Sequence, residues 1–251
     1  KHGQRQQWEE NIKPGLTYSY SDGTVIGEIE DRKGAEGHLI GGQYKKKLQV
    51  VARGGGRVWA RWEDMDSTLC EAEGVLHTME LATPIRMRHP GTRILHSLDN
   101  QGVVRRFMRL GRLTPRQWLK MEHNDIWEKI KVELDKWGDR FQVRWERGHP
   151  ERRQPDSSKW NRHQWGNHLA DKEADVAMEG QGEDEGTRQH RDTGEGPRLT
   201  LHGNRVTGNV RKVVLEEMMD ARMKGWLQSK NGHREANWGV MDAVAAQAGM
   251  G

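Results

Sequence analysis

Residues 16–24, LTYSYSDGT, open the part of the chain that has the character of a folded domain. They alternate apolar and small polar residues, and this period of two is typical of a half-buried β-strand. Asp22 and Gly23 form a turn pair, so we expect the strand to end there. Further strands are expected at 37–43, 48–52 and 57–63, separated by glycine-rich turns. Together with the first strand they predict an antiparallel meander.

After the meander, the apolar spacing changes to that of helices. Ser67 opens a helix that we expect to run to about Leu81, with Pro84 ending it. RILHS at 93–97 and FQVRW at 141–145 predict two short strands, and helices are expected at 100–110, 118–137 and 165–177. This order of elements predicts an α/β fold, with a five-stranded mixed sheet flanked by helices.

The distribution of apolar residues divides the chain into four parts. We expect a polar linker at 1–15, one domain at 16–179, a disordered linker at 180–199, and a small helical extension of unknown role at 200–251. The extension carries one helical stripe, formed by Val210, Val213, Val214, Met218 and Ala221. Because the sequence begins at Lys1, we interpret it as a piece of a longer chain.

Composition excludes several classes of protein. The single cysteine, Cys70, excludes an intramolecular disulfide framework and a cysteine-rich zinc site, and it fits a reducing compartment. No run approaches the roughly 18 apolar residues of a membrane span, and no secretory signal opens the sequence. We therefore expect an intracellular protein, cytoplasmic or nuclear.

The formal net charge of +4 is unevenly distributed. No acidic residue interrupts the segment 105–120, which contains Arg105, Arg106, Arg109, Arg112, Arg116 and Lys120. Such a basic segment indicates a polyanionic partner, and a solvated basic helix is the alternative.

Four acidic residues lie at strand ends or on the inward side of expected helices. Asp22 and Asp99 close strands, and in an open α/β sheet side chains from neighbouring strand ends converge. Glu71 shares a helix side with Val75 and Thr78, and small and apolar residues flank Asp171. Clustered carboxylates repel each other unless a cation is present, and hard oxygen ligands suit one or two Mg²⁺ ions.

Five short motifs, taken in order, resemble those of type 1 ribonuclease H domains. They are SDGT (21–24), STLCEAEGVL (67–76), SLDNQGVV (97–104), RGHP (147–150) and GNHLAD (166–171). Each motif alone is weak, but five in the right order and spacing are a strong signal, and the resemblance covers roughly residues 16 to 177. With eleven tryptophans and a polar extension, the chain looks more like the ribonuclease H domains of retroelement polyproteins than like a cellular repair enzyme.

The resemblance implies a ribonuclease H-like fold and hydrolysis of the RNA strand of RNA–DNA hybrids with two Mg²⁺ ions, for which Mn²⁺ can substitute. It implies metal binding by Asp22, Glu71, Asp99 and Asp171. His149 would assist the attacking water or product departure, and a reverse transcriptase domain of the same polyprotein would be a partner. Contacts to nucleic acid are implied for Gly23, Thr24, Asn100, Gln101, Arg105, Arg106, Arg109 and Arg112.

Some assignments have competitors in the sequence. Glu73 competes with Glu71, which we prefer because Gly74 then aligns with a small position frequent in retroelement members. Asp175, one turn after Asp171, is expected to be exposed or scaffolding. The long loop after His149 leaves the position of that histidine open. We expect packing roles for Trp160 and Trp165, with base stacking as the alternative, and surface positions for His163 and His168.

Two other functions fit parts of the pattern. One is a catalytically silent ribonuclease H-like scaffold or connector that binds nucleic acid, although degenerate copies usually lose at least one of the four carboxylates. The other is a transposase or integrase, which also uses clustered acidic residues. The GNHLAD helix after a GHP loop fits ribonuclease H better.

Overall fold

The computed structural model describes residues 15–28, 31–44, 47–60, 64–180, 200–201, 204–206 and 210–229. Of the expected linkers at 1–15 and 180–199 and the expected extension at 200–251, residues 1–14, 181–199 and 230–251 lie outside the described residues. The strands of the main sheet are β1 (Leu16–Ile26), β2 (Lys33–Tyr44), β3 (Lys47–Val58), β4 (Arg93–Leu98) and β5 (Phe141–Trp145). The helices around it are α2 (Ser67–Leu81), α3 (Thr83–Arg88), α4 (Gln101–Phe107), α5 (Pro115–Leu119), α6 (Asn124–Trp137) and α7 (Arg162–Glu179).

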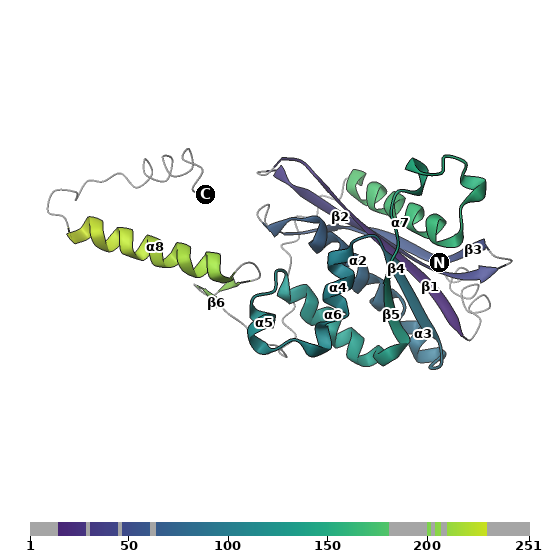
Figure 1. Cartoon of the computed structure of the whole chain (residues 1–251), viewed down its shortest axis with the longest axis horizontal. Coiled ribbons are helices and arrows are strands. Elements are labelled where there is room, and N and C mark those ends of the chain that lie inside the picture. The colour runs from purple at the N-terminus through teal and green to yellow at the C-terminus, as the bar shows by residue number, and fades with distance from the viewer. Residues whose placement is uncertain are drawn as a thin grey trace.

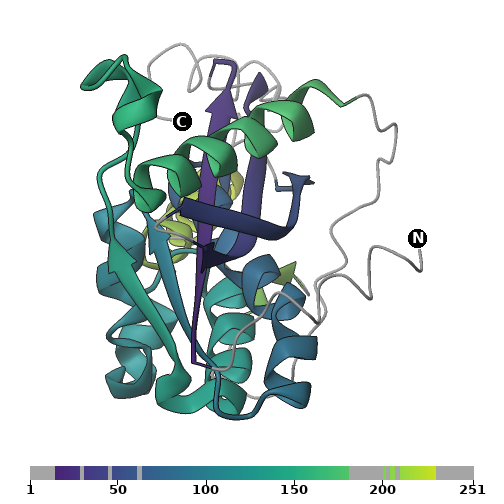
Figure 2. The same ribbon diagram turned by 90° about the vertical axis from the view of Figure 1, so that its right-hand side faces the viewer.

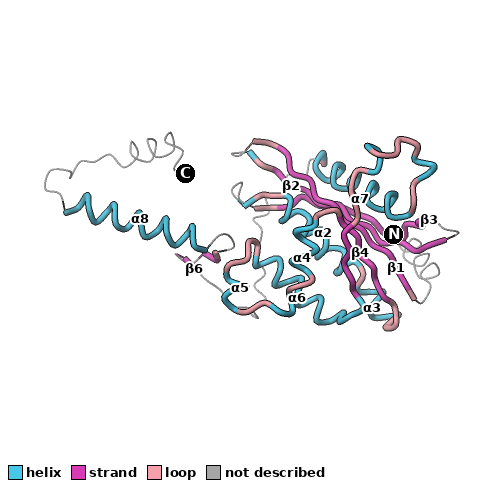
Figure 3. Tube along the Cα trace, viewed as in Figure 1, coloured by secondary structure: helices cyan, strands magenta, loops and turns pink. Residues whose placement is uncertain are grey.

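The sheet has five strands in the order β3-β2-β1-β4-β5. β1, β2 and β3 pair antiparallel, whereas β4 pairs parallel with both β1 and β5. The predicted fold class, a five-stranded mixed sheet flanked by helices, is therefore confirmed. Figure 1 shows α7 on one side of the sheet and α2, α4 and α6 on the other, and Figure 3 shows the strands as a layer between them.

The two faces of the sheet have cores of different size. The larger core lies under α2, α4 and α6 and includes Leu69, Met79, Trp127 and Phe141. The smaller one lies under α7 and consists of Tyr18, Tyr20, Leu39 and Ala170. Figure 2 shows how α7 crosses the first strands of the sheet, which places this helix beside the same strand that carries Asp22.

The predicted turn at Asp22 and Gly23 is wrong, because β1 continues through both residues to Ile26. Asp22 pairs with Gly37 and Gly23 with Glu36 in β2. A Cβ atom on Gly23 would lie 2.7 Å from the Cβ atom of Cys70 in α2, so glycine here permits a close approach of helix and strand. The Asp-Gly pair therefore serves packing and not chain reversal.

The two strands predicted at 48–52 and 57–63 are one strand as far as Val58. Gly54, Gly55 and Gly56 pair with residues of β2 and do not form a turn. A Cβ atom on Gly55 would lie 2.7 Å from the carbonyl oxygen of Glu173 in α7. Residues 61–63 of the second predicted strand lie outside the described residues.

The helix predicted at 118–137 is two helices, α5 and α6. The break falls at His123, which adopts a left-handed conformation with φ of 55°. Its Nε2 atom lies 3.1 Å from Oδ2 of Asp66, the residue that caps the N-terminus of α2. A tertiary contact therefore interrupts a helical pattern that is locally continuous. Pro84 ends α2 as predicted but also lies in the first turn of a further helix, α3.

The C-terminal region contains a short hairpin that the sequence did not predict, and one helix that it did. The hairpin consists of β6 (Thr200–Leu201) and β7 (Asn204–Arg205), and the helix is α8 (Val210–Ser229). Val206 is buried, and its carbonyl oxygen accepts a hydrogen bond from Nδ2 of Asn124 at 3.4 Å. No helix in the described parts of the chain has the length and apolar character needed to cross a membrane.

Candidate metal centre

Asp22 lies in the middle of β1, between the α2 side and the α7 side of the sheet. Its Oδ1 atom accepts a hydrogen bond of 2.8 Å from the backbone N–H of Gly23. Burial, followed by the nearby negative charges of Asp99 and Asp171, raises the pKa of Asp22 to about 8. The side chain therefore sits where other carboxylates already concentrate negative charge.

Glu71 reaches the same place from the second turn of α2. The helix begins at Ser67 because the side chain of Asp66 accepts a hydrogen bond of 2.7 Å from the N–H of Leu69. Glu71 is buried, and burial together with Asp22 and Asp99 raises the pKa of its carboxyl group well above the usual range. Among the described residues, no hydrogen-bond partner reaches its Oε2 atom. Such a buried oxygen needs a partner, and the described residues do not supply one.

Asp99 follows the last residue of β4, next to the cap of α4. Its backbone carbonyl accepts a hydrogen bond of 2.8 Å from the indole N–H of Trp145, which ties β4 to the end of β5. A Cβ atom on Gly148 would lie 1.9 Å from Oδ2 of Asp99, so the loop after β5 lies directly against this carboxylate. Only a glycine permits that approach.

Asp22, Glu71 and Asp99 converge. One ligand oxygen from each of the three side chains lies within 4.8 Å of the others. The residues come from β1, α2 and the end of β4. The sheet order places β1 beside β4, and α2 packs against β1 at Gly23. We call these three residues the carboxylate cluster. In the competition between Glu71 and Glu73, it is Glu71 that lies in the cluster.

Asp171 lies in α7, on the opposite side of the sheet from α2. Its negative charge raises the pKa of Asp22, so it adjoins the carboxylate cluster without being one of its three members. Burial raises the pKa of Asp171 itself, followed by the charge of Asp175, while His149 acts in the opposite direction. Asp175 is half exposed and pairs with Lys172 at 2.9 Å. The two aspartates of α7 therefore have different surroundings.

The position of α7 depends on glycines at its contacts with the sheet. A Cβ atom on Gly166 would lie 2.4 Å from the ring of Tyr20, and one on Gly37 would lie 2.1 Å from the carbonyl oxygen of Ala170. These contacts bring the helix down onto β1 and β2. They hold Asp171 near the strand that carries Asp22.

His149 begins a short 3-10 helix, η5 (Pro150–Arg152), in a left-handed conformation with φ of 49°. Its Nδ1 atom lies 3.4 Å from Oε1 of Glu151, and its charge lowers the pKa of Asp171. The long loop after β5 therefore keeps His149 on the side of the cluster where Asp171 lies.

The residues expected to contact nucleic acid lie on and around α4. Asn100 caps this helix, because its Oδ1 atom accepts a hydrogen bond of 3.1 Å from the N–H of Val103. Arg106 pairs with Glu122 at 3.0 Å, whereas the side chains of Gln101, Arg105, Arg109 and Arg112 are exposed. Thr24 is partly buried in β1, and Gly23 lies against α2.

The expectation of a surface position is wrong for His163. This residue is buried, its Nδ1 atom lies 3.1 Å from the hydroxyl of Tyr20, and burial lowers its pKa to about 4. The side chain packs under α7 against the smaller core. Trp160 and Trp165 pack edge to face at 5.0 Å, and Trp160 also packs edge to face on His168 at 5.0 Å.

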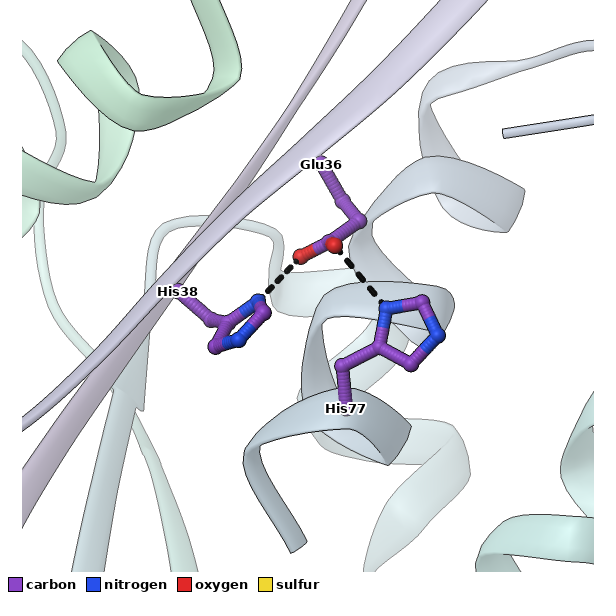
Figure 4. Close-up of side chains that lie close together, drawn as sticks. All are labelled: Glu36, His38 and His77. Carbon is purple, nitrogen blue, oxygen red and sulfur yellow. Dashed lines mark hydrogen bonds and ion pairs between the residues drawn. The ribbon is translucent and has the colours of Figure 1, made fainter. Parts of the chain in front are cut away.

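A second group of titratable side chains was not predicted from the sequence. Figure 4 shows the carboxylate of Glu36 between the rings of His38 and His77, with one oxygen toward each ring. Both Nδ1 atoms lie 2.8 Å from a carboxylate oxygen. Glu36 and His38 are two residues apart in β2, and this spacing was the available signal, since it puts both on one face of a strand.

The carboxylate cluster fits divalent metal ions. Its members are acidic, close together, partly buried and include one oxygen without a partner. Like charges at this separation repel one another strongly, and a hard cation with oxygen ligands removes that repulsion. The three carboxylates, with Asp171 beside them, are the residues that would hold Mg²⁺.

The similarity between this chain and known proteins is low. No family model and no curated protein matches the chain. Solved structures similar to it include the prototype foamy virus protease-reverse transcriptase, at 22% identity, with a TM-score of 0.48 and coverage of 66% of this chain and 21% of the viral one. Ribonuclease H1 of Halobacterium salinarum is 17% identical, with a TM-score of 0.42 and coverage of 65% and 98%. LC11-RNase H1, solved in complex with an RNA/DNA hybrid, is 12% identical, with a TM-score of 0.43 and coverage of 64% and 99%.

The strand order and directions of the main sheet, with helices on both faces, are properties of this chain's own structure (Figure 1). All three similar structures have TM-scores below 0.5 and identities of 22% or less. The chemistry has to be argued from the side chains of this chain.

Proposed function

We propose that this chain is a metal-dependent endonuclease that hydrolyses the RNA strand of RNA–DNA hybrids. The observation that carries the proposal is the convergence of Asp22, Glu71 and Asp99 within 4.8 Å, with Asp171 adjoining them. Neither the repulsion among these groups nor the unpartnered Oε2 of Glu71 contributes to a stable fold. Such an arrangement fits a site that is selected for binding cations.

Asp22, Glu71, Asp99 and Asp171 would hold two Mg²⁺ ions, with Mn²⁺ as a substitute. When bound, such a pair of ions supplies an acidified water as nucleophile and stabilises the leaving 3′ oxygen of a phosphodiester. The role of the carboxylates is to fix the number and position of these ions. Asp22, in β1, and Asp99, directly after the adjacent strand β4, are suited to define the site most closely.

A role for His149 at the edge of the site is part of the proposal. The support for it is that the charge of His149 acts on Asp171, from the left-handed position at the start of η5. We infer that His149 assists the attacking water or the departure of the product. Gly148 supports this role because it lets the loop lie against Asp99.

The exposed arginines beside α4 would contact phosphates. Arg105, Arg109 and Arg112 lie on the segment that follows Asp99 in the chain, so a strand bound at the cluster would pass near them. Such contacts position a duplex without reading its sequence. Discrimination between RNA and DNA would instead come from 2′-hydroxyl groups at the cleaved strand, and we propose Gly23, Thr24, Asn100 and Gln101 as the residues near them.

The retroelement setting, with a reverse transcriptase domain in the same polyprotein, stays part of this proposal. It is supported by the Trp-rich composition and the polar segment that follows the domain. An intracellular location is proposed on the same grounds, together with the single cysteine.

A labelled RNA–DNA hybrid, a duplex DNA and a duplex RNA of one sequence test the proposal, each incubated with the full chain in Mg²⁺ and in EDTA. We expect cleavage of the RNA strand of the hybrid in Mg²⁺ only, leaving a 3′ hydroxyl and a 5′ phosphate. Binding of the hybrid without cleavage in Mg²⁺ or Mn²⁺ would instead identify a catalytically silent scaffold. Preferential cutting or joining of duplex DNA would favour a transposase or integrase.

A further inference from the structure

Glu36 is enclosed between β2 and α2, and only 1% of the residue is exposed. Two glycines lie beside its carboxylate. Added Cβ atoms would come within 3.4 Å of Oε1 at Gly56 and within 3.5 Å of Oε2 at Gly74. The absence of side chains at these two positions leaves space around both oxygens.

Two imidazole rings reach this carboxylate from different elements. His38 Nδ1 lies 2.8 Å from Oε2, and His77 Nδ1 lies 2.8 Å from Oε1 (Figure 4). Glu36 and His38 come from β2 and His77 from α2, six residues after Glu71 in the same helix. One ligand atom from each of the three residues lies within 4.8 Å of the others.

We propose that Glu36, His38 and His77 form a second divalent-cation site, distinct from the carboxylate cluster and suited to a transition metal ion such as Zn²⁺. Two imidazole nitrogens and one carboxylate oxygen are ligands that Zn²⁺ prefers, whereas Mg²⁺ prefers oxygen alone. A tetrahedral ion with bonds of about 2.0–2.1 Å holds its ligand atoms roughly 3.4 Å apart. The distances from His38 Nδ1 to Oε2 and from His77 Nδ1 to Oε1 are both 2.8 Å. To accommodate the ion, each would have to lengthen by roughly 0.6 Å.

The site has a path to solvent. The side chain of His77 is 39% exposed and that of His38 is 14% exposed, whereas Glu36 lies beneath them. A water molecule would complete the coordination from the open side, as in other sites with three protein ligands. Binding displaces the two Nδ1 protons, either to Nε2 of the same ring or to solvent, so that affinity increases with pH.

Metal binding at this site would fasten α2 to the sheet near the carboxylate cluster. Glu36 pairs in register with Gly23, the neighbour of Asp22, and His77 lies in the helix that carries Glu71. The bound ion would therefore have a structural role, holding in place the two elements that supply Asp22 and Glu71. It would not contact the substrate.

The test is a titration of the metal-stripped full chain with Co²⁺ and Zn²⁺, without nucleic acid. We expect one equivalent of Co²⁺ to bind with the visible absorption of a four-coordinate ion, and Zn²⁺ to displace it and raise the thermal midpoint. His77→Gln and His38→Gln should weaken this binding by at least about a hundredfold, which is ~2.7 kcal/mol. Both variants should keep the wild-type circular dichroism spectrum in EDTA.

Two controls separate this site from the rest of the chain. His89→Gln changes a histidine far from Glu36 in the sequence and should leave Co²⁺ binding unchanged. Asp99→Asn alters the carboxylate cluster and should also leave it unchanged. The proposal is overturned if the wild-type chain shows no four-coordinate Co²⁺ spectrum, if His77→Gln binds as tightly as wild type, or if Asp99→Asn abolishes binding. Because no cleavage is measured, these outcomes do not depend on the proposed nuclease activity.

Discussion

Two buried carboxylates, Glu71 and Glu36, differ in their partners more than in their burial. Glu71 meets two other acidic side chains, and its pKa is raised by burial, Asp22 and Asp99. Burial also raises the pKa of Glu36, but hydrogen bonds and charges from His38 and His77 outweigh it, so the net shift is downward. A partner of opposite charge, and not depth in the protein, decides which acid stays ionised.

The comparison separates a group of like charges from a group whose charges compensate one another. The carboxylate cluster carries repulsion that an added cation or a bound proton relieves, whereas in the metal-free chain hydrogen bonds from two imidazoles satisfy the Glu36 carboxylate. Functional sites commonly tolerate such local instability. Changes at the two groups should therefore have opposite effects on stability and unequal effects on activity.

The largest effect is expected from Asp99→Asn. It removes a charged ligand from the carboxylate cluster, and we predict that the rate of RNA cleavage in a hybrid falls about a thousandfold, or ~4 kcal/mol of transition-state stabilisation. Single-turnover cleavage in saturating Mg²⁺ measures this. Asp175→Asn is the matched control, because Asp175 pairs with Lys172 on the same helix as Asp171 and should leave the rate within about threefold of wild type.

If Asp99→Asn retained normal rates, or if Asp175→Asn lost as much as Asp99→Asn, the assignment of the site would be wrong. Thermal unfolding of each variant checks that a loss of rate is not a loss of folding.

Glu36→Gln should have the largest effect on stability. The change replaces one of the two carboxylate oxygens with an NH2 group, so one imidazole N–H loses its acceptor and the charge of His77 loses its partner. We expect the free energy of unfolding to fall by about 3 kcal/mol in metal-free buffer. Urea unfolding measures it, with Glu80→Gln on the exposed side of α2 as the control. An unchanged midpoint for Glu36→Gln would contradict the view that this group is internally compensated.

Two histidines, His96 and His77, should make opposite contributions to the pH dependence of stability. Burial lowers the pKa of His96 to about 3, between Ser19 and Ser21, whereas Glu36 raises the pKa of His77 to about 9 against burial. Below pH 6.5 the unfolded chain binds a proton at His96 that the folded chain does not. The free energy of unfolding therefore decreases as the pH is lowered, by up to about 1.4 kcal/mol per pH unit, until about pH 3. The contribution of His77 is fully present below pH 6.5 and is lost as the pH rises through about 9.

Urea unfolding of wild type and His96→Gln at pH 6.5, 5.5 and 4.5 (chosen to span about two units below the usual histidine pKa) measures the first contribution. We expect the acid-side decline to be shallower in the variant. Equal slopes in both proteins would show that His96 is not held neutral.

The smallest change in the free energy of unfolding is expected from Glu71→Gln, and the direction of this change is what distinguishes Glu71 from Glu36. Removing one of three mutually repelling acids should raise the free energy of unfolding of the metal-free chain by about 1 kcal/mol. The stabilisation that added Mg²⁺ gives the wild-type chain should be reduced at the same time. Thermal unfolding in EDTA and in Mg²⁺ measures both, with Glu73→Gln as the control. A destabilised Glu71→Gln chain in EDTA would remove the contrast with Glu36.

The sequence predicted best those elements whose ends are set locally. Helix α2 has the predicted bounds, 67–81, because Asp66 caps its first turn and apolar residues recur at helical spacing. Strand β5 also has its predicted bounds, since FQVRW alternates between buried and exposed positions. The prediction that Asp22, Glu71 and Asp99 lie together rested on motif order and, for Asp99, on a strand end that the structure has.

The failures have a common physical cause, because each involves a residue whose role is set by a distant segment. Gly23 and Gly55 were interpreted as turn residues, but both allow a helix to approach the sheet. His123 interrupts a helix through its contact with Asp66, far away in the sequence. The group formed by Glu36, His38 and His77 depends on how α2 packs against β2 (Figure 4), and no local sequence pattern encodes that packing.

The central claim is that Asp22 and its neighbours form a cation-dependent site for cleaving RNA in a hybrid. The most direct measurement is the rate of RNA-strand cleavage by the full chain as Mg²⁺ is titrated from zero, with Asp22→Asn in parallel. We predict no cleavage without Mg²⁺, a rate that rises to saturation in the wild-type chain, and a loss of about a thousandfold in the variant. Cleavage in the absence of any divalent ion, or an Asp22→Asn chain that cleaves at the wild-type rate, would contradict the claim.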